Sequence, residues 1–390
     1  MQAKLLLSYN IRMKKYDVIV VGGGLAGIIA SLELKKRGIN CALIEAKDRI
    51  GKKILASGNG KCNILNFNLS SDKYNSDFVD YVVNKYNFSY LYNYYNNMGI
   101  VLKEDQEGRV YPYSESANTI LSVLLSQLEK YRVEIILNSK VLSISKNDSY
   151  IVKTEADSFI CDKVILASGS NASFGFNSHS ILANFGHEST KLKQTLVPLK
   201  TNAFIGVNGV RAKAKLSLYI EDKCVFSENG ELLFKDGALS GILAFKASSF
   251  IAREMVKNNS DKIDAQAVID FMPEYSKEEI KEILDNSPLE NPLLGMLHKA
   301  IALNIEKKGD IVENIKNYKC KIDGLTNLDS AQVTSGGLST SQFDNKTFES
   351  KLQKGLYAIG EVLDVDGECG GYNLSFALMS ALACVDGITC

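Results

Sequence analysis

The sequence predicts an α/β protein in which one discontinuous domain is interrupted by an insertion. Three observations support this fold class. Residues 16–46 follow the pattern strand, glycine turn, helix, strand, which is a βαβ unit. Residues 195–246 are short β-like runs with glycine turns, and residues 248–316 have a helical pattern. After Leu325 the chain returns to strand, glycine-rich loop and apolar helix. The N-terminal and C-terminal segments are therefore predicted to form one domain together, and the middle of the chain to form a second.

The composition is that of a globular chain without an overall charge. Its 390 residues are enough for two or three domains. Lys plus Arg and Asp plus Glu both total 45, so we expect neither a nucleic-acid partner nor binding to an anionic membrane. No apolar run approaches the ~20 residues of a membrane-spanning helix, and residues 1–15 lack a signal-peptide core. We therefore expect a cytoplasmic protein, and the sequence favours no particular oligomeric state.

Eight cysteines and three histidines are scattered along the chain without a C-x-x-C pair. This spacing provides no set of metal ligands, so no metal site is expected. Several of the cysteines lie in apolar runs, where a reduced thiol behaves as a small hydrophobic side chain. Cys62 and Cys369 are expected to be bystanders, because no second cysteine lies near position 62 in the sequence to relay electrons.

The opening βαβ unit carries a dinucleotide-binding fingerprint. Gly22, Gly24 and Gly27 satisfy G-x-G-x-x-G directly after a strand and at the start of a helix. The first glycine permits the turn, the second lets the backbone approach a pyrophosphate, and the third lets the helix pack on the strand. Glu45 ends the second strand, where its carboxylate can accept hydrogen bonds from ribose hydroxyls. A carboxylate repels a 2′-phosphate, so the bound adenosine should lack one.

The rest of the chain is predicted element by element. Residues 48–66 are polar and irregular, residues 74–98 are helical, and residues 101–112 form a hairpin around Gly108. Ser114 or Ser116 caps the helix that follows. Four strands come next, at residues 133–137, 140–145, 150–155 and 159–169. In the helical part of the insertion, Ser276 and Glu279 have the spacing of a capping box.

The C-terminal segment favours FAD over a nicotinamide cofactor. Glu361 follows a strand and Gly360, so an acid-bearing glycine turn stands near each end of the chain. FAD is long enough to reach both turns, whereas a nicotinamide domain usually continues as a doubly wound sheet instead of β-meander-like strands. The run from Gly370 to Asn373 opens an apolar helix, and its N–H groups suit the negative charge that forms on a reduced flavin.

Four motifs carry a family resemblance: "SGNGKCNILN" (57–66), "GRVYPYS" (108–114), "VTSGGLS" (333–339) and "GEVLDVDGECGGYNLSFAL" (360–378). With them the chain resembles the BaiN/YhiN-like family of FAD-dependent oxidoreductases, which includes aminoacetone oxidase-like proteins. The resemblance implies a Rossmann-type FAD-binding domain of the two-dinucleotide-binding-domain flavoprotein type, with an inserted β-rich domain and a small helical subdomain. The expected bounds are 14–191 and 325–390 for the FAD-binding domain, 192–247 for the β-rich substrate domain and 248–324 for the helical subdomain.

The resemblance also implies where FAD lies. The ADP half would contact Gly22, Gly24, Leu25, Ala26, Gly27, Glu45 and Ala46, with Lys52 and Lys53 near phosphate or adenosine and Val141 against adenine. The ribityl and flavin part would contact Ser57, Gly58, Asn59, Ser168, Gly169, Gly360, Glu361, Gly371, Tyr372 and Asn373. The sequence departs from the family pattern after Gly169 and at Lys235-Asp236, around the expected substrate cavity, so the substrate stays open.

Three functions remain open at this point. The first is an FAD-dependent oxidoreductase that takes hydride from NADH or NADPH, bound transiently, and reduces a small organic acceptor such as an activated C=C bond. The second is a flavin oxidase of an amine or aminoketone that uses oxygen and releases hydrogen peroxide. The third is an FAD-containing factor that binds RNA or protein. No residue stands out as the catalytic acid or base.

The insertion also carries a basic cluster, made by Lys200, Arg211, Lys213 and Lys215. A run of this kind is usually a solvated strand face. The alternative is a site for an anionic substrate or for the phosphates of NAD(P)H.

Overall fold

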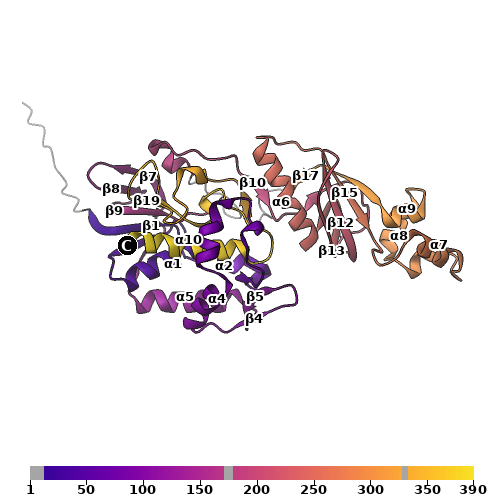
Figure 1. The fold of residues 1–390 in the computed structure, drawn as a ribbon, viewed down its shortest axis with the longest axis horizontal. Coiled ribbons are helices and arrows are strands. Elements are labelled where there is room, and N and C mark those ends of the chain that lie inside the picture. Colours follow the sequence, from indigo (N-terminus) through magenta and orange to yellow (C-terminus); the bar gives the residue numbers. More distant parts are fainter. Residues whose placement is uncertain (1–12, 171–178, 327–332) are drawn as a thin grey trace, which may run out of the picture.

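The computed structural model describes residues 13–170, 179–326 and 333–390. In Figure 1 the chain forms two bodies. The body on the left contains the N-terminal third of the chain together with the yellow C-terminal segment, and the body on the right contains the middle of the chain. The predicted α/β class and the discontinuous domain are confirmed.

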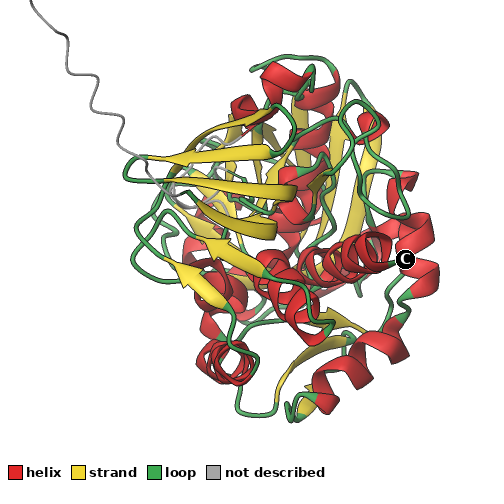
Figure 2. Ribbon diagram, turned by 90° about the vertical axis from the view of Figure 1, so that its left-hand side faces the viewer, coloured by secondary structure: helices red, strands yellow, loops and turns green. Residues whose placement is uncertain are grey.

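A parallel sheet forms the centre of the α/β domain, in the order β6-β2-β1-β9 with β19 beside β9. Figure 2 looks at this domain, with its strands in yellow and its helices in red. β7 and β8 continue the sheet beyond β9 as an antiparallel meander, as predicted. The strands are β1 (Lys14–Val21), β2 (Cys41–Ile44), β6 (Glu134–Ile136), β7 (Val141–Lys146), β8 (Tyr150–Thr154), β9 (Ser158–Leu166) and β19 (Leu356–Ala358).

Two helices from opposite ends of the sequence pack against each other beside this sheet. α1 (Leu25–Lys36) starts directly after β1, and its first ten residues are all buried. α10 (Tyr372–Thr389) is long and apolar enough to cross a membrane, but most of its residues are buried in the protein. Because it packs on α1, α10 is a core helix of the α/β domain.

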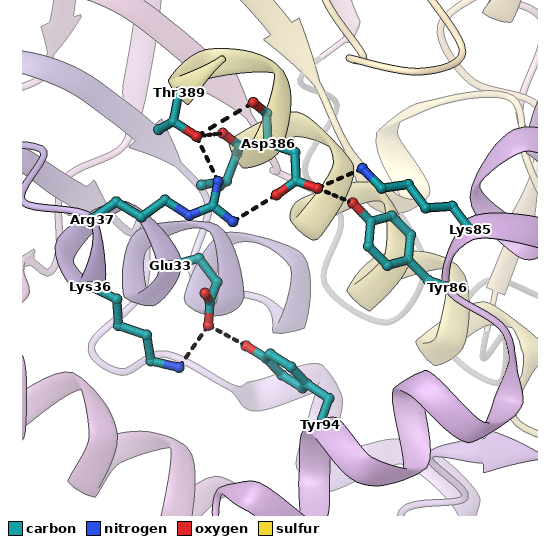
Figure 3. A network of polar contacts seen from close by, with 9 residues as sticks. Glu33, Lys36, Arg37, Lys85, Tyr86, Tyr94, Asp386 and Thr389 are labelled. Atoms are coloured by element: carbon teal, nitrogen blue, oxygen red, sulfur yellow. Dashed lines mark hydrogen bonds and ion pairs between the residues drawn. The ribbon is translucent and has the colours of Figure 1, made fainter.

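Polar contacts fix these two helices to the neighbouring helices α3 (Asp80–Lys85) and α4 (Phe88–Asn97). The Asp386 carboxylate of α10 accepts hydrogen bonds from Arg37, Lys85 and Tyr86, as Figure 3 shows. Glu33 of α1 accepts hydrogen bonds from Lys36 and from Tyr94 of α4, each at 2.7 Å.

The single helix expected over residues 74–98 is divided into α3 and α4 in the structure. The chain breaks at Asn87, whose side chain caps α4 by accepting a hydrogen bond from the Tyr90 N–H.

A small antiparallel sheet lies next to α10. It contains β3 (Leu65–Asn66), β4 (Leu102–Glu104) and β5 (Arg109–Pro112), and Gly108 turns the predicted hairpin with a φ of 75°. α2 (Lys52–Ala56) precedes it, and α5 (Ala117–Lys130) follows with Ser116 at its N-cap.

The inserted domain is a seven-stranded antiparallel sheet in the order β16-β15-β12-β13-β14-β11-β17. α6 (Ile242–Lys257) packs on one face of this sheet and also on the link between the two domains. That link pairs β10 (Lys193–Thr195) with β18 (Val333–Ser335). The sheet strands are β11 (Leu199–Lys200), β12 (Arg211–Ile220), β13 (Lys223–Lys235), β14 (Ala238–Ser240), β15 (Ala265–Asp270), β16 (Tyr318–Ile322) and β17 (Gly324–Leu325).

Residues 248–324 do not form a helical subdomain separate from the β-rich segment. β15 and β16 lie in this range, yet they are hydrogen-bonded into the same sheet as β12. Their alternating burial is the period of a half-buried strand, which the helical pattern around them obscured. The predicted helices α7 (Lys277–Asp285), α8 (Lys299–Glu306) and α9 (Ile311–Lys316) lie between these two strands, and Ser276 and Glu279 make the predicted capping box of α7.

Candidate functional site

Two cavities of the α/β domain meet end to end. The smaller has an empty volume of about 640 Å³, partly open to solvent, and lies between the Gly22–Gly24 turn and the residues after β2. The larger has an empty volume of about 1160 Å³, also partly open to solvent, and extends past the start of α1 to the loop before α10. Both are lined by Gly24, Lys53, Ala167 and Gly169, so they form one continuous channel.

The glycine turn explains why the channel starts there. A Cβ atom on Gly22 would lie 2.5 Å from the Ala167 carbonyl oxygen, and a Cβ on Gly27 would lie 1.9 Å from the Gly22 carbonyl oxygen. These two glycines therefore allow α1 and β9 to pack closely on the turn. Gly24 is different, because a Cβ there would meet nothing within 4 Å. Gly24 lines the channel at the N-terminus of α1, where a pyrophosphate group would be accommodated.

Glu45 is fixed at one end of the channel. Its Oε2 accepts a hydrogen bond from the Gly23 N–H at 2.7 Å, and its Oε1 accepts one from the Lys47 N–H at 2.8 Å. The carboxylate is half-buried and lines the smaller cavity. Two backbone donors hold its oxygens in place, so their remaining lone pairs are available to ribose hydroxyls.

An ion pair between Lys53 and Glu361 lies where the two cavities join. The Glu361 Oε1 also accepts hydrogen bonds from the Ser170 hydroxyl at 2.7 Å and from the Thr334 N–H at 3.1 Å. Residues from both ends of the chain and from β18 thus meet at one carboxylate. The Lys53 cation suits a charged pyrophosphate group. The Glu361 carboxylate beside it suits the hydroxyl groups of a neutral ribityl chain.

The far end of the larger cavity is formed by the loop that opens α10. A Cβ on Gly371 would lie 2.4 Å from the Leu65 carbonyl oxygen, so only glycine lets this loop approach β3. Asn373 bonds Gly367 in both directions at 2.9 Å, which fixes the loop internally. Leu196 and Val333, from the link to the inserted domain, line the same cavity. The start of α10 and the apolar side chains of Leu196 and Val333 are together suited to the ring end of a flavin.

Most of the predicted cofactor residues line this channel. They are Gly22, Gly24, Leu25, Ala26, Glu45, Ala46, Lys52, Lys53, Ser57, Gly58, Ser168, Gly169, Glu361, Gly371 and Asn373. Five do not line it: Gly27, Asn59, Val141, Gly360 and Tyr372. Asn59 is exposed, whereas Val141 is buried in β7 and Tyr372 is packed edge-on against Tyr74. Gly360 is buried, and its N–H donates to the Ser380 hydroxyl.

Several channel residues were not predicted. Gly23 is the donor that orients Glu45, and its sequence signal was present, since it lies between two fingerprint glycines. Asn63 and Glu368 line the larger cavity, as do Leu196 and Val333. Val333 begins the motif "VTSGGLS", whereas Leu196 gave no signal, because it reaches the site only through the pairing of β10 with β18.

Cys62 and Cys369 are both free thiols. Burial raises the pKa of Cys62 to about 11, and it does not line the channel. Cys369 lines the larger cavity, and burial raises the pKa of its thiol as well, so both thiols are protonated near neutral pH. In the described ranges, no group of three His, Cys, Asp or Glu side chains could hold a metal ion.

Comparison with known proteins gives a family match over nearly the whole chain. The family model of the "HI0933-like protein Rossmann domain" matches residues 16–387. The chain is 28% identical to the 3-dehydro-bile acid delta(4,6)-reductase of Clostridium scindens, over 92% of this chain and 95% of that protein. It is 28% identical to the ribosomal RNA dihydrouridine synthase of Haemophilus influenzae (97% and 100% covered) and 26% identical to that of Escherichia coli (96% and 98%).

Among solved structures, an open conformation of a flavocytochrome c3 fumarate reductase is similar in fold. It matches with a TM-score of 0.50 and 15% identity, over 96% of this chain and 78% of that one. At this identity the likeness describes the fold alone.

Proposed function

Because this chain belongs to the HI0933-like family of FAD-dependent oxidoreductases, we propose that it reduces a carbon–carbon double bond conjugated to a carbonyl group, with NADH or NADPH as hydride donor. The observation that carries this proposal is the continuous channel from Glu45 to Gly371. The charged residues Glu45, Arg49 and Lys52 line one end of it, and Leu196 and Val333 line the end next to the inserted domain. Such a channel suits an extended dinucleotide such as FAD, whose two halves would occupy its two cavities.

The names of the relatives support the choice of bond. A delta(4,6)-reductase of a 3-dehydro-bile acid and a dihydrouridine synthase both describe the addition of two hydrogens to a double bond conjugated to a carbonyl group. The substrates differ in size and charge, so the shared feature is the chemistry at the flavin. A bound FAD supplies hydride transfer, and the protein supplies position, electrostatics and exclusion of water.

Each part of the channel has a task in this proposal. Gly24 and the N-terminus of α1 bind the pyrophosphate, Glu45 binds the adenosine ribose, and Glu361 binds the ribityl chain. The loop at Gly370 and Gly371 would lie beside the pyrimidine side of the ring, where reduction places negative charge, and the dipole of α10 would favour that charge. Leu196 and Val333 line the cavity on the side of the inserted domain, where they would exclude water from the ring.

The relatives change the expectation about nucleic acid. The balanced charge of the whole chain argued against an RNA partner, yet two relatives are named as enzymes of ribosomal RNA. The total charge says nothing about how charge is distributed over a surface. An RNA-borne base is therefore a candidate substrate beside a free small molecule.

The test is anaerobic turnover. Purified protein carrying FAD is mixed with NADH or NADPH without oxygen, and the loss of the oxidised flavin spectrum is followed. A 3-keto-4,6-diene steroid or ribosomal RNA is then added, and we expect the flavin to reoxidise while one of the two gains two hydrogens by mass. Protein stripped of FAD is the control. Hydrogen peroxide formed from an amine without nicotinamide oxidation would instead establish the oxidase alternative.

A further inference from the structure

The inserted sheet has one covered face and one open face. Along β12 the even-numbered residues from Ala214 to Ile220 are buried, while Lys213 and Lys215 are exposed. The buried side packs on α6 and on the aromatic cluster of Phe204, Phe234 and Tyr318. On the other side, Lys316 at the end of α9 covers Asp270, whereas Arg211, Lys213, Lys215, Lys319 and Lys321 are exposed to solvent.

The register of the strands places four lysines together on the open face. Lys215 and Ser217 of β12 pair with Asp270 and Val268 of β15, and Val268 pairs in turn with Lys319 of β16. The same alternation puts Lys213 and Lys321 on this side. We call Lys213, Lys215, Lys319 and Lys321 the cationic face. Only β15 separates β12 from β16, and by the register Lys215 and Lys319 lie roughly 12 Å apart. Lys213 and Lys321 lie at opposite ends of this face, roughly 22 Å apart.

Two lysines of the cationic face have a carboxylate opposite them, since Lys213 pairs across strands with Glu231 and Lys215 with Asp270. None of its four lysines forms an ion pair with a carboxylate in the described ranges. The two acids on this side of the sheet already have partners, since Glu231 is paired with Arg211 and Asp270 with Lys316. Four like charges on one face repel one another, and this repulsion is relieved when a polyanion binds.

The need to protect a sheet edge from pairing with another chain can explain Lys319 and Lys321, but not Lys213 and Lys215. β16 is an edge strand, where lysine commonly prevents pairing with another chain. β12 lies inside the sheet between β15 and β13, so Lys213 and Lys215 have no edge to protect. The face also carries Ser217, Tyr219, Asn229 and Gln266, and side chains of these types commonly bind phosphate and sugar oxygens.

The open face is one sheet thickness from the candidate active site. On the covered side, Glu228 of β13 accepts a hydrogen bond from Lys246 of α6 at 2.6 Å. Glu228 and Lys246 are also close enough to act electrostatically on Tyr372 and Cys369, respectively, although burial is the main cause of the raised pKa of both groups. α6 also packs on β10 and β18, and Leu196 and Val333 at the ends of these strands line the channel.

We propose that the cationic face docks RNA, through phosphate contacts of its four lysines, and so holds the RNA whose base is reduced at the flavin. This inference rests on the proposed function, because it supplies the substrate class for the same site. A flat sheet that presents lysine, polar side chains and one tyrosine suits RNA, which many proteins bind on an open sheet. A base that reaches the flavin must first be unstacked from its neighbours in the RNA, which costs free energy. Binding of the RNA to a neighbouring surface offsets that free energy.

The test measures RNA binding without nicotinamide, so its outcome does not depend on turnover. The probe is a fluorescein-labelled single-stranded RNA of mixed sequence, titrated with FAD-loaded protein at several salt concentrations. We compare wild type with the quadruple variant K213Q/K215Q/K319Q/K321Q. If each lysine neutralises one phosphate, the slope of log affinity against log salt should fall by about 3. We expect affinity at physiological salt to fall at least tenfold.

The matched control is K130Q/K153Q/K351Q/K354Q, which removes four exposed lysines from the α/β domain. It should bind RNA like wild type. An equal loss in the control, no loss in the cationic-face variant, or no binding by wild type would overturn the proposal. Equal affinity for DNA of the same sequence, or binding to phosphatidylserine vesicles instead of RNA, would overturn the assignment to RNA. If the flavin test fails while this pattern of binding holds, the docking face stands and the reaction is wrong.

Discussion

Arg253 of the inserted domain and Asp366 of the loop before α10 form an ion pair across the domain boundary. The Arg253 Nε donates to Asp366 Oδ2 at 2.9 Å, and its Nη2 donates to the Asp366 carbonyl oxygen at 3.0 Å. The Asp366 side chain is only 1% exposed. Two residues further on, the same loop lines the channel at Glu368. This pair therefore ties the position of the inserted domain to the loop expected beside the flavin.

Arg253→Ala should destabilise the protein strongly. It leaves the buried Asp366 carboxylate without its cation, which typically costs about 3–5 kcal/mol of unfolding free energy. Burial raises the pKa of Asp366, and Arg253 opposes that effect. Without Arg253 the pKa rises further, so the folded state holds the proton more tightly and the destabilisation should be larger at pH 8 than at pH 5. Urea unfolding at both pH values measures this difference.

The double variant Arg253→Ala/Asp366→Asn is the control for that experiment. It replaces the unpaired Asp366 carboxylate with a neutral amide, so it should be more stable than Arg253→Ala alone at pH 8. Arg253→Lys keeps the charge but loses the two-donor geometry, and it should fall between wild type and Arg253→Ala. Equal stability of all three variants would mean that the pair does not couple the two domains.

Gly24→Ala and Gly27→Ala should fail in different ways. A Cβ on Gly24 points into empty space, so the protein should fold normally but bind FAD at least tenfold more weakly, because the methyl group occupies the place of the pyrophosphate. A Cβ on Gly27 would collide with the Gly22 carbonyl oxygen, so that variant should lose stability first. Flavin titration and thermal unfolding of the apoproteins separate the two effects. A Gly24→Ala protein that retains full flavin affinity contradicts the placement of the pyrophosphate.

Glu45→Arg should weaken FAD retention. The variant replaces a carboxylate held by two backbone N–H groups with a bulky cation, so ribose hydroxyls lose their acceptor. A lost hydrogen bond to a charged group costs about 1.5–3 kcal/mol, which corresponds to roughly a tenfold to hundredfold weaker affinity. Glu129→Arg, on the exposed end of α5, makes the same charge change away from the channel and should bind FAD like wild type. Full flavin occupancy of Glu45→Arg would refute the ribose assignment.

Asp386→Asn should reduce stability in a pH-dependent way. Burial tends to raise the pKa of Asp386, but hydrogen bonds from Lys85, Tyr86 and Arg37 outweigh it, so the pKa is lowered (Figure 3). A lowered pKa stabilises the fold above the unfolded value of about 3.9, and this contribution is lost as the pH falls through the folded value. After solvent screening, the variant should lose about 1–2 kcal/mol at pH 7. Melting curves at pH 7 and pH 3 test this, because the two proteins should converge at the lower pH.

Much of the α/β domain and its family could be predicted from the sequence. The turn at Gly22, the meander of β7 to β9 and the capping box at Ser276 are encoded within short windows, where period and turn chemistry act locally. The family resemblance is confirmed by a match over residues 16–387. The sheet membership of β15 and β16 was missed, because each strand is short and stands among helices.

The sequence by itself determined a discontinuous α/β flavoprotein with an acid-bearing glycine turn near each end. Each glycine turn depends on residues a few positions apart, whose backbone preferences act locally. Only the tertiary structure decided that Lys53 meets Glu361, 308 positions away, that Arg253 reaches Asp366, and that four lysines of two non-adjacent strands share one face. Such pairs depend on how separate elements pack, and packing is a property of the whole chain that no local pattern records.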